Sequence, residues 1–284
     1  MTGAEEGQRE FQYTAADFER VRALIHRRAG ISLSVQKADM VYSRLARRLR
    51  SLGLKRFCDY LDALETDSGP EWEAFTNSLT TNLTAFFREA HHFPVLSEHL
   101  LARRGSGRLM LWCCAASTGE EPYSIAMTAV EAFGGFDAPV SILATDVDTQ
   151  VLRKAEAGVY TAERLERMPE HQKQRFFLRG TGAQTGMVRV RPELQRMVTF
   201  RALNLLDSSW PLRGPFDAIF CRNVMIYFDK ATQAGILRRF APLLRSDGLL
   251  FVGHSESLFH VADAFKLRGK TVYERCLGRG RDAA

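Results

Sequence analysis

The stretch from Arg108 to Tyr123 constrains the fold of this 284-residue chain more than any other part of it. It reads RLMLWCCAASTGEEPY: an apolar run of strand length, a few small polar residues, and an acidic helix start with proline in its first turn. The pattern predicts a strand, a tight loop and a helix over Pro122–Phe133. In an open α/β sheet, such a unit binds a ligand at the carboxyl end of its strand, in the crevice where the strand order reverses.

The loop between this strand and helix favours a nucleoside over a dinucleotide. Small side chains at 115–117 and at Gly119 would let a cofactor approach the backbone closely. The loop lacks the three glycines of a dinucleotide fingerprint, and Glu120 and Glu121 put negative charge where a pyrophosphate would bind. A cationic or neutral nucleoside fits better. By itself, the loop also fits an ordinary strand-to-helix corner in which Gly119 is only a turn.

A second strand, predicted over Pro139–Asp146, ends in an acid. In doubly wound nucleotide-binding folds an acid at this place accepts the ribose hydroxyls, and we assign that role to Asp146. We assign Asp148 a structural role as the N-cap of a helix over Thr149–Ala157. Strands and a helix alternate again between positions 216 and 276, and this order predicts a doubly wound α/β sheet.

The first 80 residues predict a small, basic helical domain. Between Arg20 and Arg56 the chain has eleven Lys or Arg residues and a single acid, Asp39. Three arginines share one face of the helix predicted over about 35–52: Arg44, Arg47 and Arg48. A solvated helix face and a docking surface for an anionic partner both remain open for this run.

A polar loop is predicted between Leu79 and Arg88. Its hydroxyl and amide side chains, which include Asn82 and Thr84, compete with helical backbone hydrogen bonds. The loop ends in two phenylalanines and Arg88, a composition that suits the wall of a binding site. A helix cap with packed aromatic side chains is the plain alternative.

Cysteine and histidine usage gives no support for a metal site. The five cysteines are odd in number and show no Cys-x-x-Cys pair, so we expect reduced core residues. His91, His92 and His99 lack the helical spacing of a metal-binding pair with a nearby acid, and we expect surface or capping groups.

Composition restricts the location and the partners. No apolar run approaches the ~20 residues that cross a bilayer, and the chain does not start like a signal peptide, so we expect a cytoplasmic protein without membrane insertion. The net charge of +6 indicates an acidic partner but does not choose among nucleic acid, membrane and acidic protein.

Three short alternating segments between 175 and 201 predict a small antiparallel sheet, inserted at about 173–201. Its polar face would collect Arg189, Arg191 and Arg201. An edge strand of such a sheet could accept a peptide by strand addition.

Four motifs together resemble the CheR family of chemotaxis receptor methyltransferases. They are TNLTAFFRE from Thr81, ASTGEEPYS from Ala116, ATDVD from Ala144 and FDAIFCRNVMIYF from Phe216. The resemblance covers nearly the whole chain. It implies a class I S-adenosylmethionine-dependent methyltransferase fold with an all-helical N-terminal domain over 1–80. The methyltransferase domain would span 81–284 and include the three-stranded β-subdomain at about 173–201.

The resemblance also implies an activity and a set of site residues. The enzyme would transfer a methyl group from S-adenosylmethionine to glutamate carboxylates of bacterial chemoreceptors in chemotaxis adaptation, and release S-adenosylhomocysteine. The family motifs place cofactor contacts at Asn82, Thr84, Arg88, Glu121, Asp146, Asn204, Leu205, Arg222 and Asn223. Arg88 and Tyr227 would lie nearest the transferred methyl group, although a packed aromatic at a strand end is the alternative for Tyr227.

The implied partner is the cytoplasmic domain of chemoreceptors, which we expect to dock on the face of Arg44, Arg47 and Arg48. In the family, the inserted sheet can grip a pentapeptide at a receptor's C-terminal end. A nucleic-acid or other protein methyltransferase, and a binding module without turnover, are the competing classes. The basic segment lacks exposed aromatic side chains for base stacking, so we expect no nucleic-acid partner, and nothing suggests more than a monomer.

Overall fold

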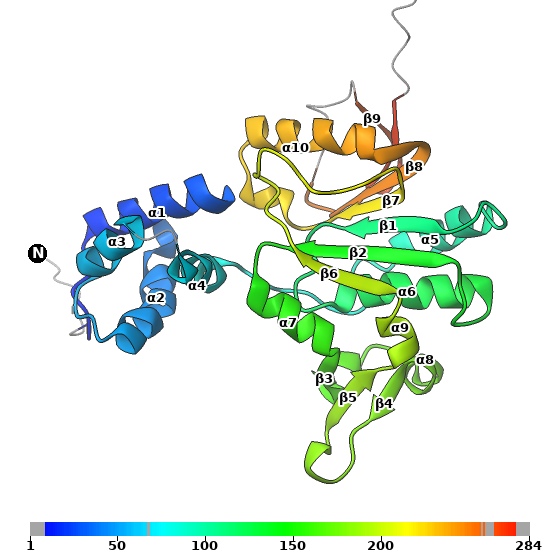
Figure 1. Ribbon diagram of the computed structural model, residues 1–284, viewed down its shortest axis with the longest axis horizontal. Helices are drawn as coiled ribbons and strands as arrows, with labels where there is room; N and C mark the ends of the chain where they lie inside the picture. The colour runs from blue at the N-terminus through cyan, green and yellow to red at the C-terminus, as the bar shows by residue number, and fades with distance from the viewer. Residues whose placement is uncertain (1–8, 67–68, 257, 259–263, 277–284) are drawn as a thin grey trace, which may run out of the picture. The chain divides into compact units, whose positions relative to one another are not determined.

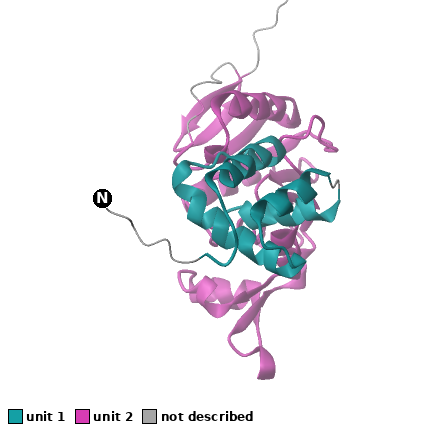
Figure 2. Cartoon of the chain, turned by 90° about the vertical axis from the view of Figure 1, so that its left-hand side faces the viewer, with its two compact units in different colours: residues 1–81 teal, residues 82–284 magenta. Residues whose placement is uncertain are grey.

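The chain forms two compact units, Met1–Thr81 and Asn82–Ala284, which Figure 2 shows in different colours. The computed structural model describes residues 9–66, 69–256, 258 and 264–276. Within these parts of the chain, no helix has the length and apolar character to cross a membrane.

The first unit is helical. Its helices are α1 (Ala15–Ala29), α2 (Ala38–Leu52), α3 (Phe57–Thr66) and α4 (Pro70–Leu79), with a 3₁₀ turn at Val35–Lys37. The apolar stripes of these helices meet in one core, in which Val21, Leu45, Phe57 and Phe75 are fully buried. The spacing of apolar residues in the sequence is therefore the feature that assembles this unit.

The second unit contains a seven-stranded sheet in the order β6-β2-β1-β7-β8-β10-β9. The strands are β1 (Leu109–Cys113), β2 (Val140–Asp146), β6 (Val198–Ala202), β7 (Phe216–Cys221), β8 (Leu244–Val252), β9 (Phe265–Gly269) and β10 (Val272–Arg275). The first five in spatial order are parallel, and β10 runs antiparallel to both of its neighbours. The chain builds outward from β1 to β6 on one side and then from β7 on the other, so the order reverses between β1 and β7.

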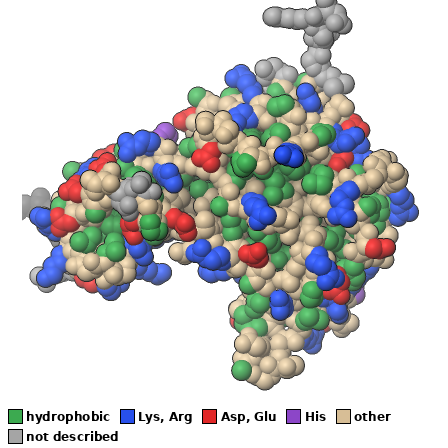
Figure 3. Space-filling view, viewed as in Figure 1, with side chains coloured by type: hydrophobic (Ala, Val, Ile, Leu, Met, Phe, Trp, Pro, Cys, Tyr) green, Lys and Arg blue, Asp and Glu red, His purple; other side chains and the backbone are tan. Residues whose placement is uncertain are grey.

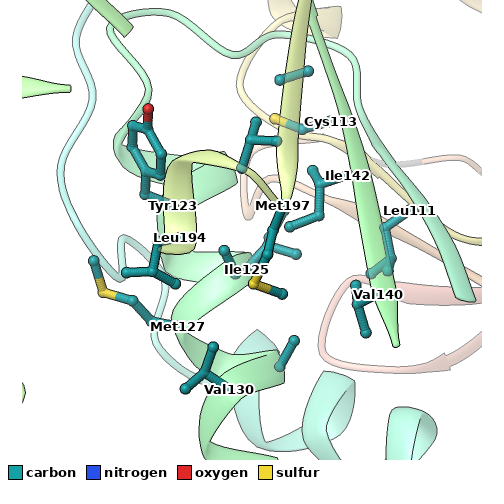
Figure 4. Close-up of a cluster of buried hydrophobic side chains, with 14 of the residues drawn as sticks. Leu111, Cys113, Tyr123, Ile125, Met127, Val130, Val140, Ile142, Leu194 and Met197 are labelled. Carbon is teal, nitrogen blue, oxygen red and sulfur yellow. The ribbon is translucent and has the colours of Figure 1, made fainter. Parts of the chain in front are cut away.

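Helices cover both faces of this sheet (Figure 1). They are α5 (His92–Leu101), α6 (Glu120–Phe133), α7 (Thr149–Ala157) and α10 (Lys230–Leu243). Within β1, Leu111 and Cys113 join the core on the α6 face, whereas Trp112 joins the core on the α10 face. Figure 4 shows the first of these cores. A strand that is buried on both faces must be apolar at every position, which explains the continuous apolar run in the sequence.

A second, three-stranded antiparallel sheet has the order β3-β5-β4. Its strands are β3 (Val159–Thr161), β4 (Phe177–Arg179) and β5 (Met187–Val190), and short helices α8 (Glu170–Phe176) and α9 (Pro192–Gln195) flank them. The predicted insertion at about 173–201 is therefore wrong in its third strand. Residues 198–202 are the edge strand of the large sheet, parallel to β2, so Arg201 does not belong to the small sheet.

Candidate active site

The carboxyl ends of β1, β2 and β7 meet where the strand order reverses. In the loop after β1, Ser117 and Gly119 have positive φ angles of 47° and 98°. A Cβ atom at Gly119 would lie 2.8 Å from Tyr160 Oη and 2.9 Å from Ala155 Cβ, so no larger side chain fits. Gly119 is therefore both a turn and the point at which this loop approaches α7 and β3.

Asp146 is the last residue of β2, as predicted, and joins two loops. Its Oδ2 accepts a hydrogen bond from the Ser117 N–H (2.8 Å), and its Oδ1 accepts one from the Asp148 N–H (3.0 Å). Burial raises the pKa of Asp146 to about 6, although these backbone hydrogen bonds act in the opposite direction. Asp148 is the N-cap of α7, as predicted, because its carboxylate accepts from the Gln150 and Val151 N–H groups.

A buried ion pair joins α6 to the end of β7. Arg222 Nη1 donates to Glu121 Oε2 at 2.7 Å, and the two residues are only 4% and 9% exposed. The Cys113 thiol lies 3.3 Å from the other oxygen of Glu121. Burial raises the pKa of Glu121, whereas the guanidinium of Arg222 opposes that shift. The second terminal nitrogen of Arg222 donates to the main-chain oxygen of Arg88.

Segment 82–89, the polar loop of the sequence, is anchored at several points. Asn82 Nδ2 donates to Asp148 Oδ2 at 2.9 Å, which ties the start of the segment to the end of β2. Arg88 Nη1 donates to Leu83 O at 2.7 Å, and Arg164 Nη1 donates to Thr84 O at 3.2 Å. These hydrogen bonds fix segment 82–89 in a defined conformation beside the carboxyl ends of the strands.

The two phenylalanines of this segment pack, as in the plain alternative, but the segment itself is no helix cap, because α4 ends at Leu79 with Thr80 as its C-cap. Phe86 makes edge contacts with the rings of Tyr160 and Phe177, with centroids 5.1 and 5.4 Å apart. Phe87 has a φ angle of 52°, and its N–H donates to Ser124 Oγ at 2.9 Å. Packed aromatic and polar side chains thus occur together in this segment, and the ring contacts of Phe86 fix it to β3 and β4.

Glu89, which is not among the predicted site residues, connects segment 82–89 to three other side chains. Its Oε1 accepts from Asn223 Nδ2 at 3.3 Å and lies 2.8 Å from His254 Nδ1. Its Oε2 lies 3.5 Å from Arg222 Nη2. Burial would raise the pKa of Glu89, but the hydrogen bond with His254 and the charge of Arg222 outweigh it and lower the pKa to about 2.

The remaining predicted residues lie in the loops after β6 and β7. The Leu203 N–H donates to Asp146 O at 3.0 Å, so Asn204 and the buried Leu205 directly follow a residue bonded to the tip of β2. Asn223 adopts a φ angle of 57° directly after Arg222. Tyr227 is half-buried in a 3₁₀ helix at Met225–Tyr227 rather than at a strand end.

Shared contacts connect most of the predicted residues. Asn82 reaches Asp148 and through it Asp146, while Arg88, Arg222 and Glu121 form one chain of hydrogen bonds. The main-chain oxygen of Thr84 accepts a hydrogen bond from Arg164, and the Tyr227 N–H donates to Val224 O. The reversal point thus gathers carboxylates, amides and guanidinium groups from four separate parts of the chain.

The prediction of surface or capping histidines is wrong for His92. His92 is fully buried rather than a surface group, and burial, with Arg222 and His91 nearby, lowers its pKa to about 3. Glu89, His91 and His92 place ligand atoms within 4.8 Å of one another. The carboxylate of Glu89 already binds His254 and Asn223 and faces the guanidinium of Arg222, which disfavours a cation there.

The arginine face of the first unit is largely engaged within that unit. Arg44 Nη1 donates to Leu79 O and Thr80 O at 3.2 and 2.6 Å, and Arg48 forms a two-pronged pair with Glu71 at 3.0 and 2.6 Å. Arg47 is exposed. On the face that Figure 3 shows, basic and acidic side chains of this unit are interspersed. Acidic side chains of flanking elements pair with the arginines of the basic segment.

Comparison with known proteins gives a consistent result over both units. The family model described as "CheR methyltransferase, SAM binding domain" matches residues 82–274, and the model described as "CheR methyltransferase, all-alpha domain" matches residues 16–80. The chain is 58% identical to the chemotaxis protein methyltransferase of Escherichia coli over 259 residues, which cover 91% of this chain and 90% of the relative. It is 56% identical to chemotaxis protein methyltransferase 2 of Pseudomonas aeruginosa over 270 residues, or 94% of this chain and 95% of the relative.

Proposed function

This chain belongs to the CheR methyltransferase family, and we propose that it transfers methyl groups at the reversal point between β1 and β7. It is an S-adenosylmethionine-dependent methyltransferase that modifies chemoreceptors in chemotaxis, and the standard activity of the family esterifies glutamate side chains. The observation that supports the proposed location is that Asp146, the Glu121–Arg222 pair and segment 82–89 meet at the carboxyl ends of the central strands. We further propose that it acts in the cytoplasm, where these receptor domains lie.

The side chains at these strand ends fit S-adenosylmethionine. Asp146 offers carboxylate oxygens for ribose hydroxyls, and the Glu121–Arg222 pair offers a carboxylate and a guanidinium for the ammonium and carboxylate groups of the amino-acid end. The hydroxyl of Ser117 is buried without a hydrogen-bond partner among the described residues, as expected for a group that awaits a ligand. The cofactor contacts proposed on this basis are Asn82, Thr84, Arg88, Glu121, Asp146, Asn204, Leu205, Arg222 and Asn223.

The protein's part in the reaction is alignment. When bound, S-adenosylmethionine supplies an electrophilic methyl group on a positively charged sulfur. A glutamate acceptor is already ionised at neutral pH, because its unperturbed pKa is about 4.3, so no general base is required. Arg88 would bind the incoming carboxylate by charge-assisted hydrogen bonds, and Tyr227 would orient it. Segment 82–89 would exclude water, which favours a reaction in which opposite charges combine.

Cofactor affinity should fall as the pH falls through about 6. Burial raises the pKa of Asp146 to that value, so the carboxylate that would accept the ribose hydroxyls is increasingly protonated below it. Calorimetric titration with S-adenosylhomocysteine between pH 8 and pH 5 measures this. Asp146→Asn should bind weakly at every pH and lose the dependence. An unchanged pH profile in that variant would reject the assignment.

We propose that receptors dock on the first unit, with Arg47 supplying the exposed charge on the face that also carries Arg44 and Arg48. Arg47→Glu should lower the rate of receptor methylation at low salt by roughly three- to tenfold, and the difference should shrink as salt screens the attraction. Arg238→Glu, at an exposed position of α10, makes the same charge change elsewhere and is the control. Equal rates for the two variants at low salt would contradict the proposal.

We also propose that a receptor's C-terminal peptide adds to an edge of the small sheet. The outer strands are β3 and β4. Arg179 on β4 and Arg189 on the central strand β5 are both exposed. A pull-down on receptor C-terminal peptides tests this, and loss of capture in Arg189→Glu is the expected result.

A further inference from the structure

We propose that Glu256 is a positioning residue for methyl transfer. This inference rests on the proposed function, and Glu256 would act through the residues that it holds. The carboxylate of Glu256 holds the segment that carries Asn223 and Tyr227 in the geometry that the reaction needs.

The carboxylate accepts four main-chain hydrogen bonds. Its Oε2 accepts from the N–H groups of Gly253 (2.6 Å) and Asn223 (2.9 Å). Its Oε1 accepts from the N–H groups of Val224 (2.9 Å) and Met225 (2.7 Å). One side chain therefore joins the loops that follow two adjacent parallel strands, β7 and β8, at their carboxyl ends.

These hydrogen bonds satisfy a carboxylate that is removed from water. Glu256 is 6% exposed, and burial raises its pKa whereas the four backbone donors lower it. Burying a carboxylate without such donors would cost free energy, so Glu256 favours the loop conformation that supplies them. If the loop moved away, the carboxylate would lose its hydrogen bonds.

The conformation that Glu256 restrains is an unusual one. Asn223 has a φ angle of 57°, a region that non-glycine residues occupy at an energetic cost unless their surroundings enforce it. A Cβ atom at Gly253 would lie 2.6 Å from Asn223 Nδ2 and 2.8 Å from Glu256 Oε2, so the two loops approach closely. Glu256 supplies the restraint on Asn223, and Gly253 makes room for it.

The same restraint extends to Tyr227. The 3₁₀ helix at Met225–Tyr227 begins at a residue whose N–H is bound to Glu256. On the opposite side, Gln233 Nε2 donates to Met225 O (2.8 Å) and Phe228 O (2.9 Å). The short helix is thus held from both sides, and the position of the Tyr227 ring depends on both.

The variant Glu256→Gln tests the proposal, because it replaces one acceptor oxygen by an NH₂ group that faces N–H donors. We expect kcat/KM for receptor methylation to fall by about 100-fold and S-adenosylhomocysteine affinity by about tenfold. Glu256→Asp keeps an ionised but shorter carboxylate and should recover part of both losses.

Asp217→Asn is the matched control. Asp217 is also a buried carboxylate that accepts a main-chain hydrogen bond, from Met110 N–H at 2.8 Å, but it lies at the opposite end of β7. It should lose thermal stability while kcat, KM and cofactor affinity stay within about threefold of wild type.

The outcomes separate this inference from the proposed function. If Glu256→Gln loses only thermal stability and keeps wild-type kinetics and affinity, as Asp217→Asn should, the residue is merely structural and the inference is wrong. If Glu256→Gln does not fold, Glu256→Asp decides, because wild-type activity in that variant also overturns the inference. Failure of the wild-type enzyme to bind S-adenosylhomocysteine would instead reject the proposed function.

Discussion

Arg88→Ala should lower receptor methylation by about 100-fold or more while leaving the fold intact, because it removes the group proposed to hold the acceptor carboxylate. The contact of residue 88 with Arg222 uses its main-chain oxygen and survives the substitution. The Arg88 side chain donates to Leu83 O, so the substitution also removes this one local hydrogen bond. Transfer of a labelled methyl group from S-adenosylmethionine to receptor membranes measures the effect.

Two further variants isolate the role of Arg88. Arg88→Lys keeps the charge but not the forked donor geometry, and should fall between wild type and Arg88→Ala. Arg164→Ala loosens the same segment at Thr84 O without removing the carboxylate ligand, so it should cost far less activity. If Arg88→Ala transferred methyl groups at close to the wild-type rate, or if Arg164→Ala were equally damaged, the assignment would be wrong.

The centre of the second unit could be predicted because its determinants are local. The apolar run of β1, the small residues up to Gly119 and the acid at the tip of β2 each specify structure through their immediate neighbours. A continuous apolar run indicates a strand that is buried on both faces, and parallel strands require crossover connections, usually helices. The location of Asp146 follows from these two constraints alone.

The small sheet could be predicted only in part, because short strands carry little periodicity. β3 is three residues long and directly follows Gly158, the end of α7, so it has no pattern of its own. The segment 198–202 alternates like a hairpin strand, yet it pairs in parallel with β2 as a sheet edge. Alternation reports that one face is buried, but it does not report which sheet buries it.

The charges of the first unit show the same limit. The segment between Arg20 and Arg56 has one acid, Asp39, and the pairing of its arginines with Glu71, Asp62 and Glu65 becomes visible only in three dimensions. A run of like charges in the sequence therefore suggests a stronger positive electrostatic potential than the folded surface presents to a partner. Arg47 is the exposed member of the three-arginine face.

Neither Glu89 nor Glu256 is among the predicted site residues, although Glu89 ends the first family motif. The Asn223 side chain is 134 positions from Glu89, and its N–H is 33 positions from Glu256. Both acids lie in irregular segments, where neither helical nor strand periodicity restricts the role of a polar residue. A resemblance can indicate which segments form a site, but the residues that support those segments emerge from contacts.

Arg222→Ala should destabilise the second unit by about 3–5 kcal/mol, the cost of leaving a buried carboxylate without its partner. Arg222 and Glu121 are both more than nine-tenths buried, and Glu89 also loses the guanidinium that lies 3.5 Å away. Urea unfolding at pH 7 measures the loss. Glu121→Gln combined with Arg222→Met removes both charges and should recover much of the stability, since a neutral pair has no unpaired ion to desolvate.

The pH dependence of Arg222→Ala distinguishes an unpaired charge from lost packing. Burial already raises the pKa of Glu121, and removing the opposing guanidinium raises it further. An acid whose folded-state pKa exceeds its unfolded value loses stability as the pH rises from the unfolded pKa to the folded one. The destabilisation relative to wild type should therefore be larger at pH 8 than at pH 5. A loss that is equal at both pH values, and that the double variant does not relieve, would mean that Arg222 stabilises the fold through packing instead.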